Sequence, residues 1–287
     1  MLFEISHRIK YSYSKQVFIE PMVIRLHPRH DPSQRVDKFT MNIEPLPASI
    51  TQYIDQDCNN ISTVWFNGLH NSLSITASSL VEVTRVNPFN FIITEDEASK
   101  IPVTYSKYDR LILEPYRKCR YNSSEINEFM NSVVEESGEE TITFLVKLAS
   151  RINEDFQKVK RERGNPFTPD KTIARRKGAC RDLAVLYMEV CRLVGLATRF
   201  VSGYCQYEES SEKDDMHAWA EVYLPGGGWC GFDPTIGLAI AEGHVAVATA
   251  ADAAYASSTS GAFRGTGVKA KLLYDISIHS VNSSVIP

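Results

Sequence analysis

The chain has 287 residues, of which 43 % are hydrophobic and 23 % charged, and its formal net charge is −4. This composition is typical of a globular protein with one large domain or two ordinary ones. The slight excess of acids argues against nucleic acid or an anionic membrane as partner, so neither is expected.

The first 105 residues have the pattern of a β-rich domain. Roughly alternating apolar and polar residues predict short strands at 3–6, 23–27, 39–43, 62–66, 73–77 and 80–84. Turn-forming residues such as Asn67-Gly68 separate these segments. We therefore expect an antiparallel, β-sandwich-like N-terminal domain over residues 1–105, with a structural or substrate-shaping role.

Two features of the sequence bear on its compartment. The first residues lack the basic start, the long apolar run and the small-residue cleavage site of a secretory signal. No apolar stretch approaches the roughly 18 residues of a membrane-spanning helix. We expect a cytoplasmic protein.

After Pro102 the apolar residues recur at helical spacing. Ser123 is predicted to cap a helix whose apolar positions include Ile126 and Phe129. A second helix is expected to begin at residues 138–141, and residues 163–170 are expected to form a loop. The sequence thus predicts a second, α+β domain over residues 106–287 that packs closely against the first.

Six cysteines are scattered along the chain without a CxxC pair, at positions 58, 119, 180, 191, 205 and 230. Zinc sites usually need closely spaced ligand pairs, so we expect no metal site. In a reducing cytoplasm most of these thiols should be small buried side chains. The question is whether one of them has different surroundings.

Cys180 is the candidate. It precedes an apolar stripe of helical spacing that Gly195 should terminate, and therefore falls in the first turn of a helix. The free N–H groups and the dipole there stabilise a thiolate, and they could also stabilise an oxyanion. Gly178 would let the backbone approach a substrate. Cys191, in the middle of the stripe, should be buried and inert.

His217 and Asp233 supply the other two groups that thiol chemistry requires. His217 opens an alternating strand pattern, and Asp233 closes the next one, just before a proline. If the two strands pair as a hairpin, their ends bring these side chains together. Imidazole serves as base and acid, and a carboxylate orients its ring. Trp219, in the strand of His217, is a candidate wall of the substrate cleft.

The motifs around these residues closely resemble those of the bacterial transglutaminase-like family, which has a papain-like core. The resemblance extends over nearly the whole chain and is carried by residues 178–182, 199–204, 217–222 and 231–235. It implies that Cys180 is the nucleophile, His217 the base and Asp233 the orienting acid. Many relatives have glutamine where this chain has Arg181, and an Arg-Asp-Tyr element of which only Asp252 remains here.

The sequence therefore predicts a cysteine-dependent acyl transfer on the amides of a peptide or protein substrate, through a thioester and without a cofactor. Hydrolysis is favoured over cross-linking to a lysine, and calcium dependence is not implied. Two alternatives stay open. One is a catalytically silent peptide-binding or interaction module, and the other is a redox protein that pairs Cys180 with Cys205 or Cys230. The sequence does not define the oligomeric state.

Overall fold

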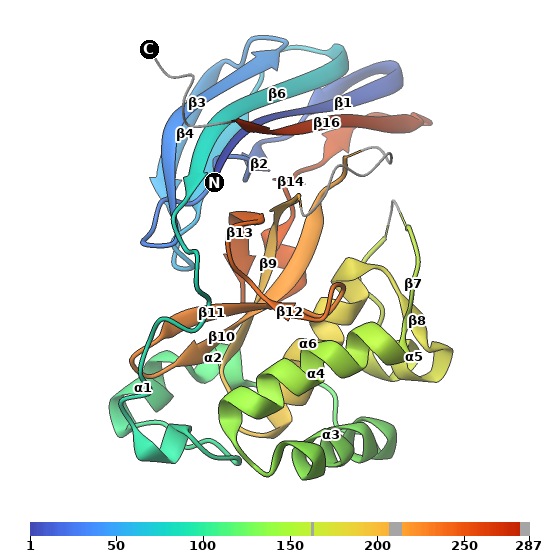
Figure 1. Ribbon diagram of the computed structural model, residues 1–287. Coiled ribbons are helices and arrows are strands. Elements are labelled where there is room, and N and C mark those ends of the chain that lie inside the picture. The colour runs from blue at the N-terminus through green and yellow to red at the C-terminus, as the bar shows by residue number, and fades with distance from the viewer. Residues whose placement is uncertain (162–163, 207–213, 282–287) are drawn as a thin grey trace.

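The computed structural model describes residues 1–161, 164–206 and 214–281. Figure 1 shows two stacked units: a β-rich unit that contains both ends of the described chain, and beneath it a core in which helices cover a sheet. Among the described residues, no helix is long and apolar enough to cross a membrane.

Two antiparallel sheets form the β-rich unit. The first contains β1 (Leu2–Ile19), β3 (Gln34–Glu44), β6 (His70–Val83), β15 (Phe263–Arg264) and β16 (Ala270–Val281). The second contains β2 (Met22–Ile24), β4 (Ser49–Ile54), β5 (Asn60–Trp65) and β14 (Thr259–Ser260). Their apolar faces share one core, with Ile9 and Ile75 from the first sheet and Ile24 and Val64 from the second. The β-sandwich-like N-terminal domain is confirmed.

The predicted strands at 73–77 and 80–84 are a single strand, β6. Only Ser78 and Ser79 separate them, and these small residues continue the pairing with β1. The sequence pattern did not reveal β4, because all six of its residues are exposed and no alternation of burial marks it.

The C-terminal part of the chain returns to the β-rich unit. β16 pairs with β1 along most of its length, from Leu2 opposite Val281 to Tyr13 opposite Ala270, while β15 pairs with the end of β1 and β14 pairs with β2. The sequence predicts a second domain that contains all of residues 106–287. The structure differs because one edge of β1 is free to pair with β16. The paired residues are more than 250 positions apart in the chain.

The core contains a five-stranded antiparallel sheet in the order β12-β11-β10-β9-β13. Its strands are β9 (Thr198–Cys205), β10 (His217–Leu224), β11 (Gly228–Asp233), β12 (Leu238–Ala239) and β13 (His244–Ala250). The helices are α1 (Lys107–Ile112), α2 (Glu114–Arg117), α3 (Ser124–Ser137), α4 (Thr141–Asp155), α5 (Pro169–Arg175) and α6 (Cys180–Leu193). Short elements complete the fold: η1 (Asp96–Ala98), β7 (Gln157–Lys158), β8 (Lys177–Gly178) and η2 (Ala253–Ala256).

The predicted helices are present, and α6 is the central one. Ser123 caps α3 by accepting a hydrogen bond from the backbone of Ile126, as expected. The apolar stripe of α6 is fully buried at Leu183, Leu186 and Cys191, where it packs in the main core cluster. Burial raises the pKa of the Cys191 thiol well above its ordinary value, which agrees with an inert packing role.

Candidate active site

A hairpin of β10 and β11 brings His217 and Asp233 together. The two strands pair antiparallel from Leu224 opposite Gly228 to Ala220 opposite Phe232. His217 and Asp233 lie at the open end of this hairpin, with His217 Nε2 2.6 Å from Asp233 Oδ2. The juxtaposition predicted from the two strand patterns is confirmed.

The two side chains form a buried, charged pair. Burial by itself would lower the pKa of His217, but the charge and hydrogen bond of Asp233, together with a hydrogen bond to Cys180, raise this pKa to about 10. Burial would likewise raise the pKa of Asp233, yet His217 and His244 hold it well below its usual range. At neutral pH the pair is therefore an imidazolium bound to a carboxylate.

Cys180 is the first residue of α6, and its half-buried thiol faces the His217 ring. Because Asp233 occupies Nε2 of His217, the Cys180 contact falls to the other ring nitrogen, Nδ1. The first N–H groups of a helix have no acceptor within the helix, and its dipole favours negative charge at this end. The structure thus places a thiol, an imidazole and a carboxylate in series.

Asp182 organises the start of α6. Its side chain is fully buried and accepts hydrogen bonds from the backbone N–H groups of Ala179 at 2.8 Å and Phe167 at 2.7 Å. Arg161 forms an ion pair with the same carboxylate. An acid in the first turn caps the helix and neutralises its dipole. Asp182 therefore fixes the backbone that carries Cys180.

A cleft of about 680 Å³ opens in front of Cys180 and His217. The core contributes one side of this cleft. The other side comes from the β-rich unit, through Ile9 and Tyr11 of β1 and Leu272 and Tyr274 of β16. The hydroxyl of Tyr11 lies 2.7 Å from that of Thr259, which also lines the cleft. The expectation that the β-rich domain shapes the substrate site fits this arrangement.

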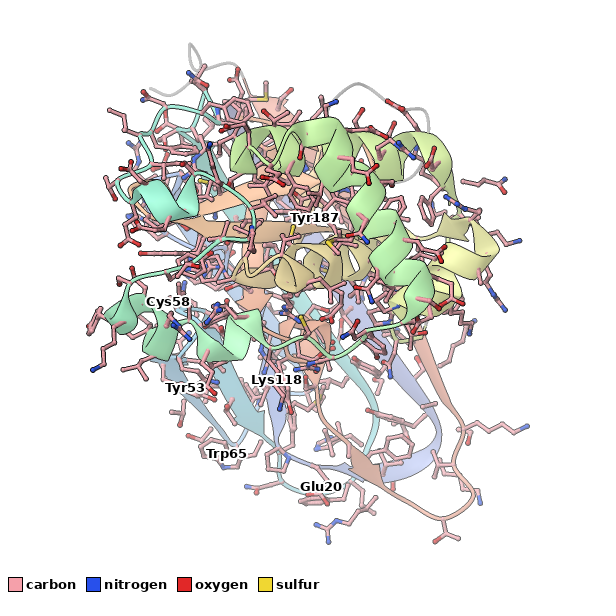
Figure 2. The ribbon with its side chains drawn as sticks, turned by 90° about the horizontal axis from the view of Figure 1, so that it is seen from below. Glu20, Tyr53, Cys58, Trp65, Lys118 and Tyr187 are labelled. Carbon is pink, nitrogen blue, oxygen red and sulfur yellow. The ribbon has the colours of Figure 1, made fainter. Side chains whose placement is uncertain are left out.

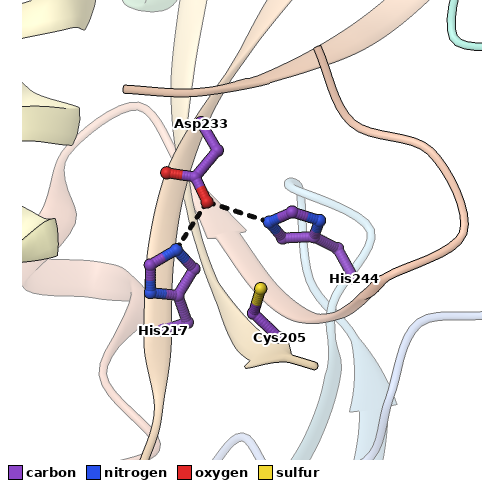
Figure 3. A group of neighbouring side chains, drawn as sticks. All are labelled: Cys205, His217, Asp233 and His244. Atoms are coloured by element: carbon purple, nitrogen blue, oxygen red, sulfur yellow. Dashed lines mark hydrogen bonds and ion pairs between the residues drawn. The ribbon is translucent and has the colours of Figure 1, made fainter. Parts of the chain in front are cut away.

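Asp233 has a second imidazole partner, His244 (Figure 3). His244 Nε2 is 3.0 Å from Asp233 Oδ2, and its side chain is 1 % exposed. Burial lowers the pKa of His244, so its ring is neutral at pH 7 and donates to the carboxylate. In the sequence His244 only interrupts an alanine-rich stretch. Its role depends on the pairing of β13 with β9, for which the sequence offers no local signal.

Cys205 completes the group in Figure 3, since it lies opposite His244 in the pairing of β9 with β13. The thiols of all six cysteines, each within the described residues, are free. Cys205 lines the same cleft as Cys180, whereas Cys230 is buried and its thiol lies 3.6 Å from the carbonyl oxygen of Gly227. Of the two partners considered for a redox role, only Cys205 shares the cleft.

Cys205, His217, Asp233 and His244 offer sulfur, nitrogen and oxygen atoms that all lie within 4.8 Å of one another. This donor set suits zinc, for which no site was expected. Tetrahedral zinc, with ligands about 2.0–2.3 Å away, holds ligand atoms about 3.3 Å or more apart. The separations of 2.6 and 3.0 Å around Asp233 Oδ2 are those of hydrogen bonds instead. In this conformation the group fits imidazole–carboxylate bonding better than it fits a metal ion.

The two predicted substrate contacts, Trp219 and Gly178, lie behind the cleft. Trp219 is 1 % exposed and packs edge-on against His244, with the ring centroids 4.9 Å apart. A Cβ on Gly178 would lie 2.9 Å from Cβ of Asp182, so this glycine makes room for α6. Neither residue is among those that line the cleft. The structure gives both residues packing roles, because the Trp219 ring is buried and Gly178 leaves space for the first turn of α6.

Comparison with known proteins agrees with this architecture. Residues 3–82 match the bacterial transglutaminase-like N-terminal region, and residues 107–234 match the transglutaminase-like superfamily. Together the two matches cover most of the chain and contain Cys180, His217 and Asp233. The chain belongs to the transglutaminase-like superfamily.

Individual relatives extend the similarity along the whole chain. An uncharacterized protein of Mycobacterium tuberculosis is 27 % identical over 87 % of this chain and 83 % of its own length. An uncharacterized protein of Mycobacterium leprae is 24 % identical over 92 % of this chain and 93 % of its own length. The solved structure called "Putative Cysteine Protease from Cytophaga hutchinsonii" has a TM-score of 0.73 at 21 % identity, and the match covers 100 % of this chain and 93 % of that one. This last similarity establishes a shared fold.

Proposed function

We propose that this protein is a cysteine-dependent enzyme that transfers the acyl group of an amide. Cys180 is the nucleophile, His217 the general base and acid, and Asp233 the group that orients His217. The observation that carries the proposal is the position of the His217 ring, bonded to Asp233 through Nε2 and to the Cys180 thiol on its other side. A complete series of this kind is the arrangement that activates a thiol.

The reaction follows from this geometry in two steps. The Cys180 thiolate attacks the amide carbonyl, and the first N–H groups of α6 stabilise the negative charge on its oxygen. The leaving amine takes a proton from His217, and a thioester remains on Cys180. A water molecule then gives its proton to His217 and attacks the thioester, which releases a carboxylic acid and restores the thiolate.

Water is favoured over a lysine amine as the second reactant. Lys158, Lys160, Arg161 and Arg181 all line the cleft around the nucleophile. Their positive charges repel a lysine ammonium group and disfavour its approach to the thioester. We therefore propose a peptidase or amidase that acts on a peptide or protein in the cytoplasm. The name of the solved structure from Cytophaga hutchinsonii, "Putative Cysteine Protease", is in keeping with this proposal. No step invokes a metal ion or a cofactor.

Alkylation of the thiols tests the nucleophile. Iodoacetamide near pH 6 should label Cys180 faster than Cys119, because Cys119 is an exposed free thiol whose pKa is raised, chiefly by desolvation and also by Glu189. Site-resolved mass spectrometry measures both rates in the same sample. Labelling of Cys180 no faster than that of Cys119 would contradict the enzyme and favour a silent binding module.

A second experiment identifies the reaction. Casein supplies glutamine, lysine and peptide bonds, and mass spectrometry distinguishes the products after incubation with the enzyme. New termini indicate proteolysis, a gain of about one dalton indicates deamidation, and linked chains that have lost ammonia indicate cross-linking. Products that persist unchanged with Cys180→Ala would show that they do not arise at this site.

A further inference from the structure

Basic side chains gather on one wall of the cleft, beside the nucleophile. Lys158, Lys160 and Arg161 come from the segment that begins in β7, and Arg181 comes from the first turn of α6. These four residues, the basic wall, come from two segments of the chain that converge next to Cys180. The chain's net charge of −4 gives no reason for such a local excess of cations.

The acids near the cleft have hydrogen-bond or ion-pair partners of their own. Asp214 accepts a hydrogen bond from the backbone N–H of Ile278 at 2.8 Å, which ties it to β16. Asp215 accepts hydrogen bonds from its neighbour Met216 and from the hydroxyl of Tyr274, also on β16. The carboxylate of Asp182 is fully buried beneath Arg161. Asp214 and Asp215 also line the cleft, but they are bonded to β16, and Asp182 lies under the surface, while the basic wall lies beside Cys180.

Two guanidinium groups of the basic wall repel each other. Burial lowers the pKa of Arg181, and the positive charge of Arg161 lowers this pKa further, against the opposing charges of Asp182, Cys180 and Asp215. Arg161 is held in place by Asp182, by the carbonyl oxygen of Asn165 at 3.0 Å and by the ring of Phe167, whose centroid is 4.2 Å from its Cζ atom. An anion bound beside both guanidinium groups would relieve their repulsion.

We propose that the basic wall selects acyl donors that carry a carboxylate close to the amide under attack. The substrate class is thus an acidic peptide or isopeptide, in which an aspartate or glutamate side chain or a terminal carboxylate lies next to the reacting carbonyl. This inference rests on the proposed function, since it names the substrate of the same thiol. Arginine and lysine on one wall bind a carboxylate, while the apolar residues of β1 and β16 accept the rest of the chain.

Two alkylating agents that differ only in charge test the selection without a known substrate. Iodoacetate carries a carboxylate at the position where iodoacetamide carries an amide, and both react at Cys180. The measured quantity is the ratio of the iodoacetate rate to the iodoacetamide rate at pH 6. Because the His217 cation also attracts iodoacetate, the ratio is compared between variants of the basic wall and the wild type.

Removal of positive charge should lower this ratio. A unit charge about 6 Å from the reagent, in a water-like dielectric, predicts a fall of about threefold for Arg181→Gln and about tenfold for Lys160→Glu. Lys160 is exposed, so its replacement does not threaten the fold. Lys107→Gln, an exposed position on α1 that does not line the cleft, is the matched control and should leave the ratio unchanged. High salt should reduce the wild-type ratio.

The outcomes separate this inference from the proposed function. Fast labelling by iodoacetamide with a ratio that is the same in Arg181→Gln, Lys160→Glu and the wild type would overturn the carboxylate preference and leave the nucleophile intact. Slow labelling by both reagents would instead contradict the enzyme itself. A ratio that falls in both wall variants but not in Lys107→Gln supports the acidic substrate class.

Discussion

His244 donates a hydrogen bond from Nε2 to Oδ2 of Asp233 over 3.0 Å. The same oxygen contacts His217, and Oδ1 accepts the backbone N–H of Thr235 at 2.8 Å. Three donors therefore hold a carboxylate that is fully buried. Because a rotation of this carboxylate would move the His217 ring, His244 is placed to position the base without touching the substrate.

Replacement of His244 should weaken thiol activation. His244→Phe keeps a ring against Trp219 but removes the donor, and a charge-assisted hydrogen bond contributes about 1.5–3 kcal/mol, so we expect Cys180 alkylation at pH 6 to slow about tenfold or more. His244→Gln retains an N–H donor and should recover part of the rate. Equal rates in the two variants would show that only the packing matters.

The charge of Asp233 should determine the protonation of His217. Asp233→Asn removes the largest of the effects that raise the His217 pKa to about 10, so this pKa should fall, since burial is then opposed only by Cys180. The rate of acyl transfer should fall by about a thousandfold or more, as when the acid of a triad is made neutral. NMR titration of the histidine nitrogens measures the pKa, and an unshifted value would contradict this account.

His7 should make the fold sensitive to mild acid. Burial lowers its pKa from 6.5 to about 4, and its Nδ1 lies 2.9 Å from the hydroxyl of Tyr204, which joins β1 to β9. Between these two pH values the unfolded chain binds a proton that the folded chain does not, so stability is lost as the pH falls from 6.5 to 4. The loss amounts to at most about 3 kcal/mol.

His7→Asn tests this dependence because it retains a polar group near Nδ1 but does not titrate. Urea unfolding at pH 7 and pH 4.5 gives the free energy of unfolding for the variant and the wild type. The difference between the two pH values should be smaller in the variant. An equal difference in both proteins would assign the acid sensitivity to other groups.

Removal of the C-terminal strands should unfold the β-rich unit. A chain that ends at residue 258 lacks β14, β15 and β16, so one edge of β1 loses its partner and the cleft loses Leu272 and Tyr274. An unpaired apolar edge promotes aggregation, so we expect loss of the monomer peak in size-exclusion chromatography. A chain that ends at residue 281 retains every described strand and serves as control.

Local patterns were sufficient to predict the three longest helices, α3, α4 and α6, and the hairpin of the site. The stripe of α6 repeats at helical spacing, and the strands of His217 and Asp233 follow each other across a short turn, so neighbours in sequence are neighbours in space. The N-terminal strands alternate because one face of each packs in the sandwich. In α6, in the hairpin and in the N-terminal strands, the pattern within one element, or within two consecutive ones, is enough to predict which residues are buried.

Two of the missed features depend on pairing between distant segments. His244 reaches Asp233 only because β13 pairs with β9, and β16 completes the first sheet only because β1 has a free edge. The loop expected at 163–170 overlaps the first two residues of α5, and the sequence pattern did not predict this helix because prolines and polar residues dominate its start. The inward direction of Trp219 also depends on its neighbours, since its ring occupies the space left by Gly203.

The wall of the cleft formed by β16 has a consequence for how the molecule matures. Leu272 and Tyr274 are translated more than 90 residues after Cys180, so a nascent chain holds Cys180 long before it holds this wall. The cleft is assembled only when a late strand docks on the first one. Such an order of synthesis delays completion of the cleft until the β-rich unit has closed around β1.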